Sequence, residues 1–412
     1  MPITKKKTPQ SHPKPKTMTV SIKYAAGAAV ATHYGFSPMP EISIEKEHLI
    51  KAKTFLEGSI KEVRPFTDSQ SKFSGYLEEK IAIIQSYMEK KMNHLQQPVM
   101  IYYEGPLRGN PHMKRGLKDR TFNLEIIGNS KPIAEAIVIE TAYVIAKERH
   151  EEELLVELNS IGDKDSATRY TRELSLYFKK HSSEWPTECR GKIKKDIFEI
   201  FSCNHEKCLE IQESAPKSIS YLSEPSRRHF MEVLEYLDSL QIPYSINHKL
   251  IGSRSYCSGT LFEIQATKKD TTHTVAIGER YNSVSKKVWG KKDIPAIGAA
   301  ISIYDAHLKT EKKRIPTAKK PKFYFIQLGH DAKLKSLKIL ETLRQAKIPV
   351  YQSLSKDKLI GQIASAEKME IKYVLIMGQK EALENTVVVR NMDTRSQNTV
   401  NLSELVAYLK KL

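Results

Sequence analysis

The stretch 101-IYYEGPLRGNPHMKRGLKDRTFNLEII-127 decides the fold. Its two ends are apolar and aromatic, whereas Gly109, Pro111 and Gly116 break regular structure in the middle. Five basic residues accompany the break: Arg108, Lys114, Arg115, Lys118 and Arg120. We therefore predict an antiparallel strand pair joined by a long basic loop. Such guanidinium groups can bind phosphates, because each presents paired donors in one plane. The plain alternative is a solvated surface loop.

Length and charge narrow the class of protein. A chain of 412 residues with 40% hydrophobic content predicts two or three domains with a sizeable core. No apolar run approaches the roughly 20 residues needed to cross a bilayer, and the N-terminus does not resemble a signal peptide, so we expect a cytoplasmic protein. The net charge of +18 favours a polyanionic partner, most simply RNA, over a merely soluble basic surface.

The cysteines offer a second possible chemistry. Cys203 and Cys208, with His205 between them and Cys189 upstream, suggest zinc, but their spacing is not that of a standard zinc finger. We predict that these three residues and Cys257 are free thiols and that the chain has no metal site.

Several short motifs resemble one known family. Gly105-Pro106-Leu107-Arg108, the basic loop and then Arg120-Thr121-Phe122 resemble motif 2 of class II aminoacyl-tRNA synthetases, and of histidyl-tRNA synthetases in particular. The segment Asn159-Ser160-Ile161-Gly162 is very similar to that family's Asn-Ser-Ile-Gly. Tyr34-Gly35-Phe36, followed by Pro40-Glu41, resembles the entry to motif 1, which implies a homodimer.

The resemblance implies an α/β protein of mixed α+β type, with an antiparallel sheet flanked by helices, a helical insertion and an anticodon-binding-like domain. Strands that alternate with helices after Phe323 agree with an α/β C-terminal domain. The predicted parts are a disordered basic tail (1–18), a synthetase-like core in two pieces (19–171 and 246–308), the helical insertion (172–245), a basic linker (309–322) and the anticodon-binding-like domain (323–412).

Few family site residues are retained. Arg108 and Arg120 match the arginines of motif 2, and Arg280 matches a Gly-Gly-Gly-Arg-Tyr-Asp segment, so the resemblance implies residual nucleotide binding by these three. Other positions depart from the pattern: Lys80 (family Glu), Ala82 (Thr), Asn110 (Glu), Leu124 (Gln), Gly252 (Arg), Ser255 (Asp), Cys257 (Tyr) and Asp305 (Arg). Asp305 falls within motif 3, whose helix we expect to begin at Pro295.

These departures predict a protein that is not a competent ligase. A cation at Lys80 repels an α-ammonium, and each lost preorganised charge typically costs about 3 kcal/mol of transition-state stabilisation. We predict no catalytic residues and no cofactor, with ATP and Mg bound only if the ligase is active. We expect the chain to bind tRNA or another structured RNA, with Lys114, Arg115 and Lys118 as contacts, or to regulate a protein partner.

Two alternatives remain open. The first is an active histidine–tRNA ligase with a rebuilt site. The second is a regulatory subunit like the synthetase-derived partner of ATP phosphoribosyltransferase. Those relatives generally lack an anticodon-type domain, so residues 323–412 argue against the second.

Overall fold

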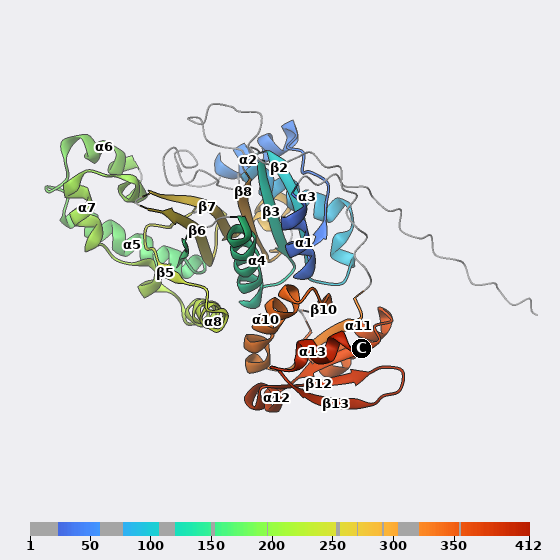
Figure 1. Ribbon diagram of the computed structural model, residues 1–412. Helices are drawn as coiled ribbons and strands as arrows, with labels where there is room; N and C mark the ends of the chain where they lie inside the picture. The colour runs from blue at the N-terminus through green and yellow to red at the C-terminus, as the bar shows by residue number, and fades with distance from the viewer. Residues whose placement is uncertain are drawn as a thin grey trace, which may run out of the picture.

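The computed structural model describes residues 24–57, 77–106, 120–149, 153–195, 197–252, 256–269, 271–290, 292–303, 321–353 and 356–412. Figure 1 shows a large central sheet, a group of helices beside it and a smaller C-terminal domain below. The predicted tail and most of the predicted basic linker lie outside the described residues.

In the described chain, eight strands form the large sheet in the order β1-β2-β3-β8-β7-β6-β4-β5. Their bounds are β1 Ser37–Pro38, β2 Val99–Pro106, β3 Arg120–Ile127, β4 Glu153–Ser160, β5 Tyr244–Ile246, β6 Thr260–Lys268, β7 Thr271–Arg280 and β8 Ala296–Ile303. The neighbours from β2 to β4 pair antiparallel, and only β1 and β5 at the two edges pair parallel.

The strand pair predicted from the opening stretch is confirmed. β2 and β3 pair antiparallel with Tyr103 opposite Asn123, and the basic loop between them lies outside the described residues. Successive side chains of a strand point to opposite faces. Tyr102, Phe122 and Leu124 therefore pack on one face of the sheet, whereas Tyr103 packs on the other.

Helices cover both faces of the large sheet. Helix α4 (Ile133–Arg149) packs against β8 and β7, and is flanked by α1 (Ala25–His33) and α8 (Glu224–Leu240). The opposite face carries α2 (Lys46–Glu57), α3 (Leu77–Glu89) and α9 (Val284–Trp289). Both layers are apolar, so each face of the sheet contributes to the core.

The expected helix at Pro295 is wrong. Residues Ala296–Ile303 form strand β8, which pairs with β3 on one side and β7 on the other. Seven of its eight side chains are buried, a pattern typical of a central strand covered on both faces.

A helical segment separates β4 from β5. It contains α5 (Lys164–Lys180), α6 (Thr187–Lys195), η2 (Ile197–Ser202), α7 (Glu206–Glu213), η3 (Ser218–Tyr221) and α8. The predicted insertion boundary at residue 172 falls inside the continuous helix α5. Ser223 is the N-cap of α8, because its Oγ accepts a hydrogen bond from the Ser226 backbone N–H.

The C-terminal residues form the predicted α/β domain. Its sheet has the order β10-β9-β11-β12-β13, built from β9 Phe323–Gln327, β10 Val350–Gln352, β11 Tyr373–Met377, β12 Thr386–Asn391 and β13 Gln397–Asn401. Helices α10 (His330–Gln345), α11 (Leu359–Lys368), α12 (Gln379–Glu384) and α13 (Leu405–Lys410) accompany it, and the sequence did not predict α12 or β13. Tyr34 of the large domain donates a hydrogen bond of 2.7 Å to Glu341 of α10, which joins the domains.

None of the helices in the described segments combines the length and apolar character that crossing a membrane requires.

Candidate functional site

A cavity opens on the α3 face of the large sheet. It is lined by residues of α3, by β2, β3, β6, β7 and β8, and by the segment 249–252. Its empty space is about 750 Å³, part of it open to solvent. Strands far apart in the sequence thus present alternate side chains to one space.

Lys80 is the central charge of the cavity. Helix α3 carries it inward, and only 5% of the residue is exposed. Its Nζ lies 3.3 Å from Glu125 Oε1 and 4.5 Å from the centroid of the Tyr281 ring. Burial acts to lower the pKa of Lys80, but the surrounding carboxylates of Glu125, Glu279 and Glu79 outweigh burial, so the pKa is raised. The ammonium therefore stays charged inside the protein.

Glu125 of β3 is the partner of this ammonium. The residue is 1% exposed and also accepts a hydrogen bond of 2.7 Å from the Tyr281 hydroxyl. Burial raises the pKa of Glu125, and Lys80 and Tyr281 offset only part of that effect. Its carboxylate has room because position 298 is glycine: a Cβ there would lie 2.0 Å from Glu125 Oε2.

Two further carboxylates share the same ammonium. Glu79 accepts a hydrogen bond of 3.0 Å from the Tyr103 hydroxyl, and Glu279 accepts one of 2.8 Å from the Cys257 thiol. Burial raises the pKa of Glu279, against the effect of Lys80 and the thiol. The cluster therefore contains more carboxylates than one ammonium can neutralise.

The structure brings Lys80 and Gly252 to one cavity, as the sequence comparison implied. Gly252 has a φ of +64°, and a Cβ on it would lie 2.2 Å from Leu261 Cδ2. An arginine at this position would be strained and would clash with Leu261. The local backbone conformation therefore requires glycine. Ile277 and Glu279 of β7 line the cavity as well.

Five of the described predicted site residues do not line the cavity. Leu124 and Ala82 are buried in hydrophobic clusters, Leu124 on the α4 face of the sheet. Arg120 has the same strand parity as Leu124, and its guanidinium lies 3.2 Å from Glu41. Strand alternation turns residues 120, 122 and 124 away from the cavity, whereas Asn123 and Glu125 line it. Cys257 donates a hydrogen bond to Glu279, which lines the cavity.

Arg280 is the fifth of these residues, and its guanidinium points away from the cavity to the α4 face. It lies at the end of β7, is 3% exposed, and forms two hydrogen bonds with Glu135 of α4, the Nε–Oε1 one of 2.6 Å. It also donates to the Asn129 carbonyl at 3.0 Å. The hydrogen bonds of this guanidinium therefore connect β7 to α4.

The remaining predicted positions lie outside the described residues: Arg108, Asn110, Lys114, Arg115, Lys118, Ser255 and Asp305. Their roles stay predictions.

Sequence reasoning missed Glu125, Glu79, Tyr103 and Tyr281. The signal available for Glu125 was a single carboxylate within the apolar run Phe122 to Ile127, because an acidic residue in a buried strand requires a partner. No spacing rule connects it with Lys80, which lies 45 residues earlier.

Glu263 gives the cavity a pH-dependent effect on stability. It lies on β6 directly opposite Glu157 of β4. Burial, and then the charge of Glu157, raise the pKa of Glu263 to about 7. A glutamate in the unfolded chain has a pKa of about 4.3. The contribution of Glu263 to the free energy of unfolding is therefore fully present below that pH and is lost as pH rises through 7.

We expect Glu263→Gln to remove this loss. The variant should be more stable than the parent above pH 7, by at most about 3 kcal/mol, and should not differ from it near pH 4. Urea unfolding midpoints at both pH values measure the difference. Glu153→Gln, an exposed position on β4, is the matched control. If the difference in stability between parent and variant is the same at both pH values, the raised pKa of Glu263 is contradicted.

The chemistry of the cavity follows from its charges. Among the described lining residues the carboxylates are Glu79, Glu125, Glu263 and Glu279, and the cations are Lys80 and Lys249. An excess of carboxylates disfavours a triphosphate and favours a cation. The buried ammonium of Lys80 already provides one.

The chain has relatives along most of its length. Residues 322–412 match the family model of the anticodon binding domain. A histidine–tRNA ligase from Desulforamulus reducens is 30% identical over 355 residues, which cover 85% of this chain and 84% of that protein. The histidine–tRNA ligase of Bacillus subtilis is 29% identical over 336 residues, covering 80% of this chain and 79% of that protein.

Solved structures of similar shape include the apo histidyl-tRNA synthetase of S. aureus, with a TM-score of 0.48 and 22% identity, covering 97% of this chain and 100% of the other. An ATP phosphoribosyltransferase regulatory subunit/histidyl-tRNA synthetase from Bacillus halodurans has a TM-score of 0.43 and 12% identity, covering 90% and 100%.

Proposed function

The chain belongs to the histidyl-tRNA synthetase family, and from that premise we propose that it binds tRNA or another structured RNA without activating histidine. The observation that carries the proposal is the buried Lys80–Glu125 pair. A free amino acid carries a positively charged ammonium group. In this chain the ammonium of Lys80 already occupies the acidic cavity. A second cation would have to displace Lys80 or share its carboxylates.

Nucleotide activation faces a further obstacle. Phosphoryl chemistry needs positive groups arranged around the reacting phosphate. Within the described lining there is no arginine, and four carboxylates accompany two lysines. The retained motif residues Arg120 and Arg280 are ion-paired with Glu41 and Glu135 on the opposite face. These features favour a protein that has kept a synthetase scaffold without its reaction.

RNA binding rests on different parts of the chain. Residues 322–412 resemble an anticodon-binding domain, and the chain carries a net charge of +18. The basic loop residues Lys114, Arg115 and Lys118 remain candidates for contacting phosphates. A homodimer and a cytoplasmic location, both expected from the sequence, belong to the same proposal.

Two assays on the full chain test the proposal. Histidine-dependent exchange of pyrophosphate into ATP should stay at background, with the Bacillus subtilis ligase as the active control. Filter binding of total tRNA should weaken as salt rises, because phosphate contacts release counterions.

Removing the charges of Lys114 and Arg115 should make the plot of log affinity against log salt shallower by about 1 to 2, at roughly 0.7–0.9 per contact. Lys90→Ala/Lys91→Ala removes two exposed charges elsewhere and should leave that slope unchanged. Robust histidine-dependent exchange would contradict the loss of activation, and tRNA affinity no greater than that of a protein lacking RNA contacts would contradict the binding.

The active ligase is the second candidate. It is favoured by relatives that are named histidine–tRNA ligases across 80% and more of this chain. Under this alternative Glu79 or Glu279 would bind the substrate's ammonium, and Lys80 would serve only to hold Glu125. The exchange assay decides between the two.

A further inference from the structure

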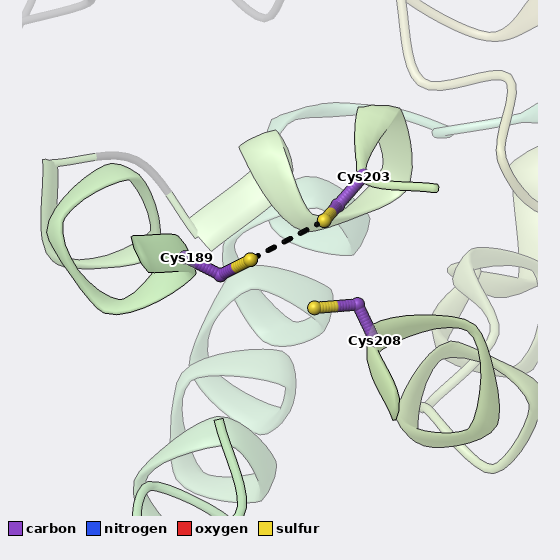
Figure 2. A group of neighbouring side chains, drawn as sticks. All are labelled: Cys189, Cys203 and Cys208. Carbon is purple, nitrogen blue, oxygen red and sulfur yellow. Dashed lines mark hydrogen bonds between the residues drawn. The ribbon is translucent and has the colours of Figure 1, made fainter. Parts of the chain in front are cut away.

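Three cysteines of the helical segment come together. Cys189 lies in the first turn of α6, Cys203 directly follows η2, and Cys208 lies in the first turn of α7. Figure 2 shows their sulfur atoms pointing toward one another from three separate pieces of chain. All three sulfurs lie within 4.8 Å of one another, and those of Cys189 and Cys203 are 3.5 Å apart. The three thiols therefore form one group, which their spacing in the sequence does not show.

The spacing of the sulfurs suits a metal ion. In a tetrahedral site with zinc–sulfur bonds of about 2.3 Å, two sulfurs lie about 3.8 Å apart. One observed distance is 3.5 Å and the others are at most 4.8 Å, so a small movement of side chains closes the site. His205, the other candidate ligand in the sequence, caps α7 and has its Nε2 3.7 Å from Glu188, and it does not belong to the group of sulfurs.

The three thiols lie in a mostly apolar setting. Cys189 and Cys208 are buried in the same hydrophobic cluster as Phe178 and Ile200. Cys203 packs against that cluster from a partly buried position. The packing of this cluster therefore holds the three sulfurs near one another.

Their position in the helices favours the thiolate form once a metal is present. The first turn of a helix carries partial positive charge, and both Cys189 and Cys208 occupy a first turn. Cys203 is only partly buried, so solvent can reach the side of the group that it forms.

We propose that Cys189, Cys203 and Cys208 bind one zinc ion as thiolates, with the fourth position completed from the solvent side. Soft sulfur ligands in this arrangement select zinc over magnesium or calcium. Binding releases the thiol protons to solvent, so no oxidant or reductant is needed. The ion would tie together α6, η2 and α7, which have only 9, 6 and 8 residues and little helical stability of their own. Its role is structural and independent of the proposed RNA binding.

Metal analysis of the full chain tests the site. Protein purified under reducing conditions without chelator, and then supplied with zinc and desalted, should hold about one zinc per chain. Cys208→Ser should lose most of that zinc. Cys257→Ser is the matched control and should keep it, because Cys257 bonds to Glu279 in the cavity and is not part of the group.

A spectroscopic measurement distinguishes the loss of a metal ligand from misfolding of the serine variant. Cobalt supplied to the parent chain should give thiolate charge-transfer absorption that added zinc removes, and circular dichroism shows whether each variant is folded. Three results would overturn the proposal: a reduced, zinc-supplied parent chain without zinc; a folded Cys208→Ser variant that binds as much as the parent; or a Cys189–Cys203 disulfide that survives reduction and excludes zinc.

Discussion

Arg280→Ala is expected to destabilise the large domain by about 3–5 kcal/mol at pH 7, because it leaves a buried carboxylate without its counter-charge. Glu135 has no exposed surface and accepts hydrogen bonds from Arg280 and, at 2.6 Å, from His229. Burial acts to raise the pKa of Glu135, but Arg280 and His229 outweigh it and the pKa is lowered. The urea midpoint of the first unfolding transition, followed by circular dichroism, measures the loss.

The pH dependence of this loss has a definite sign. The parent gains stability from ionised Glu135 above the unfolded pKa of about 4.3 and loses it as pH falls below that value. The difference between variant and parent should therefore shrink as pH falls, because the carboxyl left without Arg280 in the variant can then take up a proton. Arg228→Ala, which removes an exposed partner of Glu224, should cost less than about 1 kcal/mol. An Arg280→Ala variant as stable as Arg228→Ala would contradict a structural role for this pair.

The fold was largely predictable because its signals are local. The opening stretch has strand-forming ends around a loop rich in glycine and proline, and the structure pairs those ends as β2 and β3. Alternating strand and helix patterns after Phe323 likewise predicted the C-terminal domain. The expected helix at Pro295 failed because local apolar character does not distinguish a buried central strand from a helix, and only the neighbours β3 and β7 decide it.

The site was less predictable, because strand residues alternate between faces. Moving a strand assignment by one residue exchanges the two faces of a sheet. The sequence comparison chose Leu124, whereas Glu125 is the residue that reaches the cavity. Arg280 shows a different limit: a resemblance gives a position in a motif, but Glu135, the side chain that binds this guanidinium, lies 145 residues away.

Contacts between distant segments explain the other omissions. Lys80 and Glu125 come from a helix and a strand that no spacing rule connects. The three cysteines likewise come from separate turns, and their separations match no standard finger, so only the packing of α6, η2 and α7 places the sulfurs together. The sequence singled out Lys80, Gly252 and the cysteines, and tertiary structure determined which side chains they meet.

Lys80→Met should reveal how strongly the cavity depends on its own cation. The change keeps most of the side-chain volume but leaves Glu125 buried without the ammonium, so we expect a loss of about 3–5 kcal/mol at pH 8. Removing Lys80 raises the folded pKa of Glu125 further, because burial already raises it. A raised carboxyl pKa stabilises the fold at low pH and destabilises it as pH rises, so the loss should be smaller at pH 5. Urea midpoints at the two pH values measure it.

Matched variants separate the charge from its surroundings. Lys80→Met/Glu125→Gln should recover most of the stability, because the amide needs no counter-ion and can still accept a hydrogen bond from Tyr281. Lys90→Met, at an exposed position beyond α3, should change stability by less than about 0.5 kcal/mol. In Lys80→Ala, added propylammonium should raise the midpoint through binding to the folded chain, and propanol should not. Two results would contradict a role for the charge of Lys80: equal effects of the two additives, or a double variant no more stable than Lys80→Met. Either result would mean that Lys80 stabilises the fold by filling space.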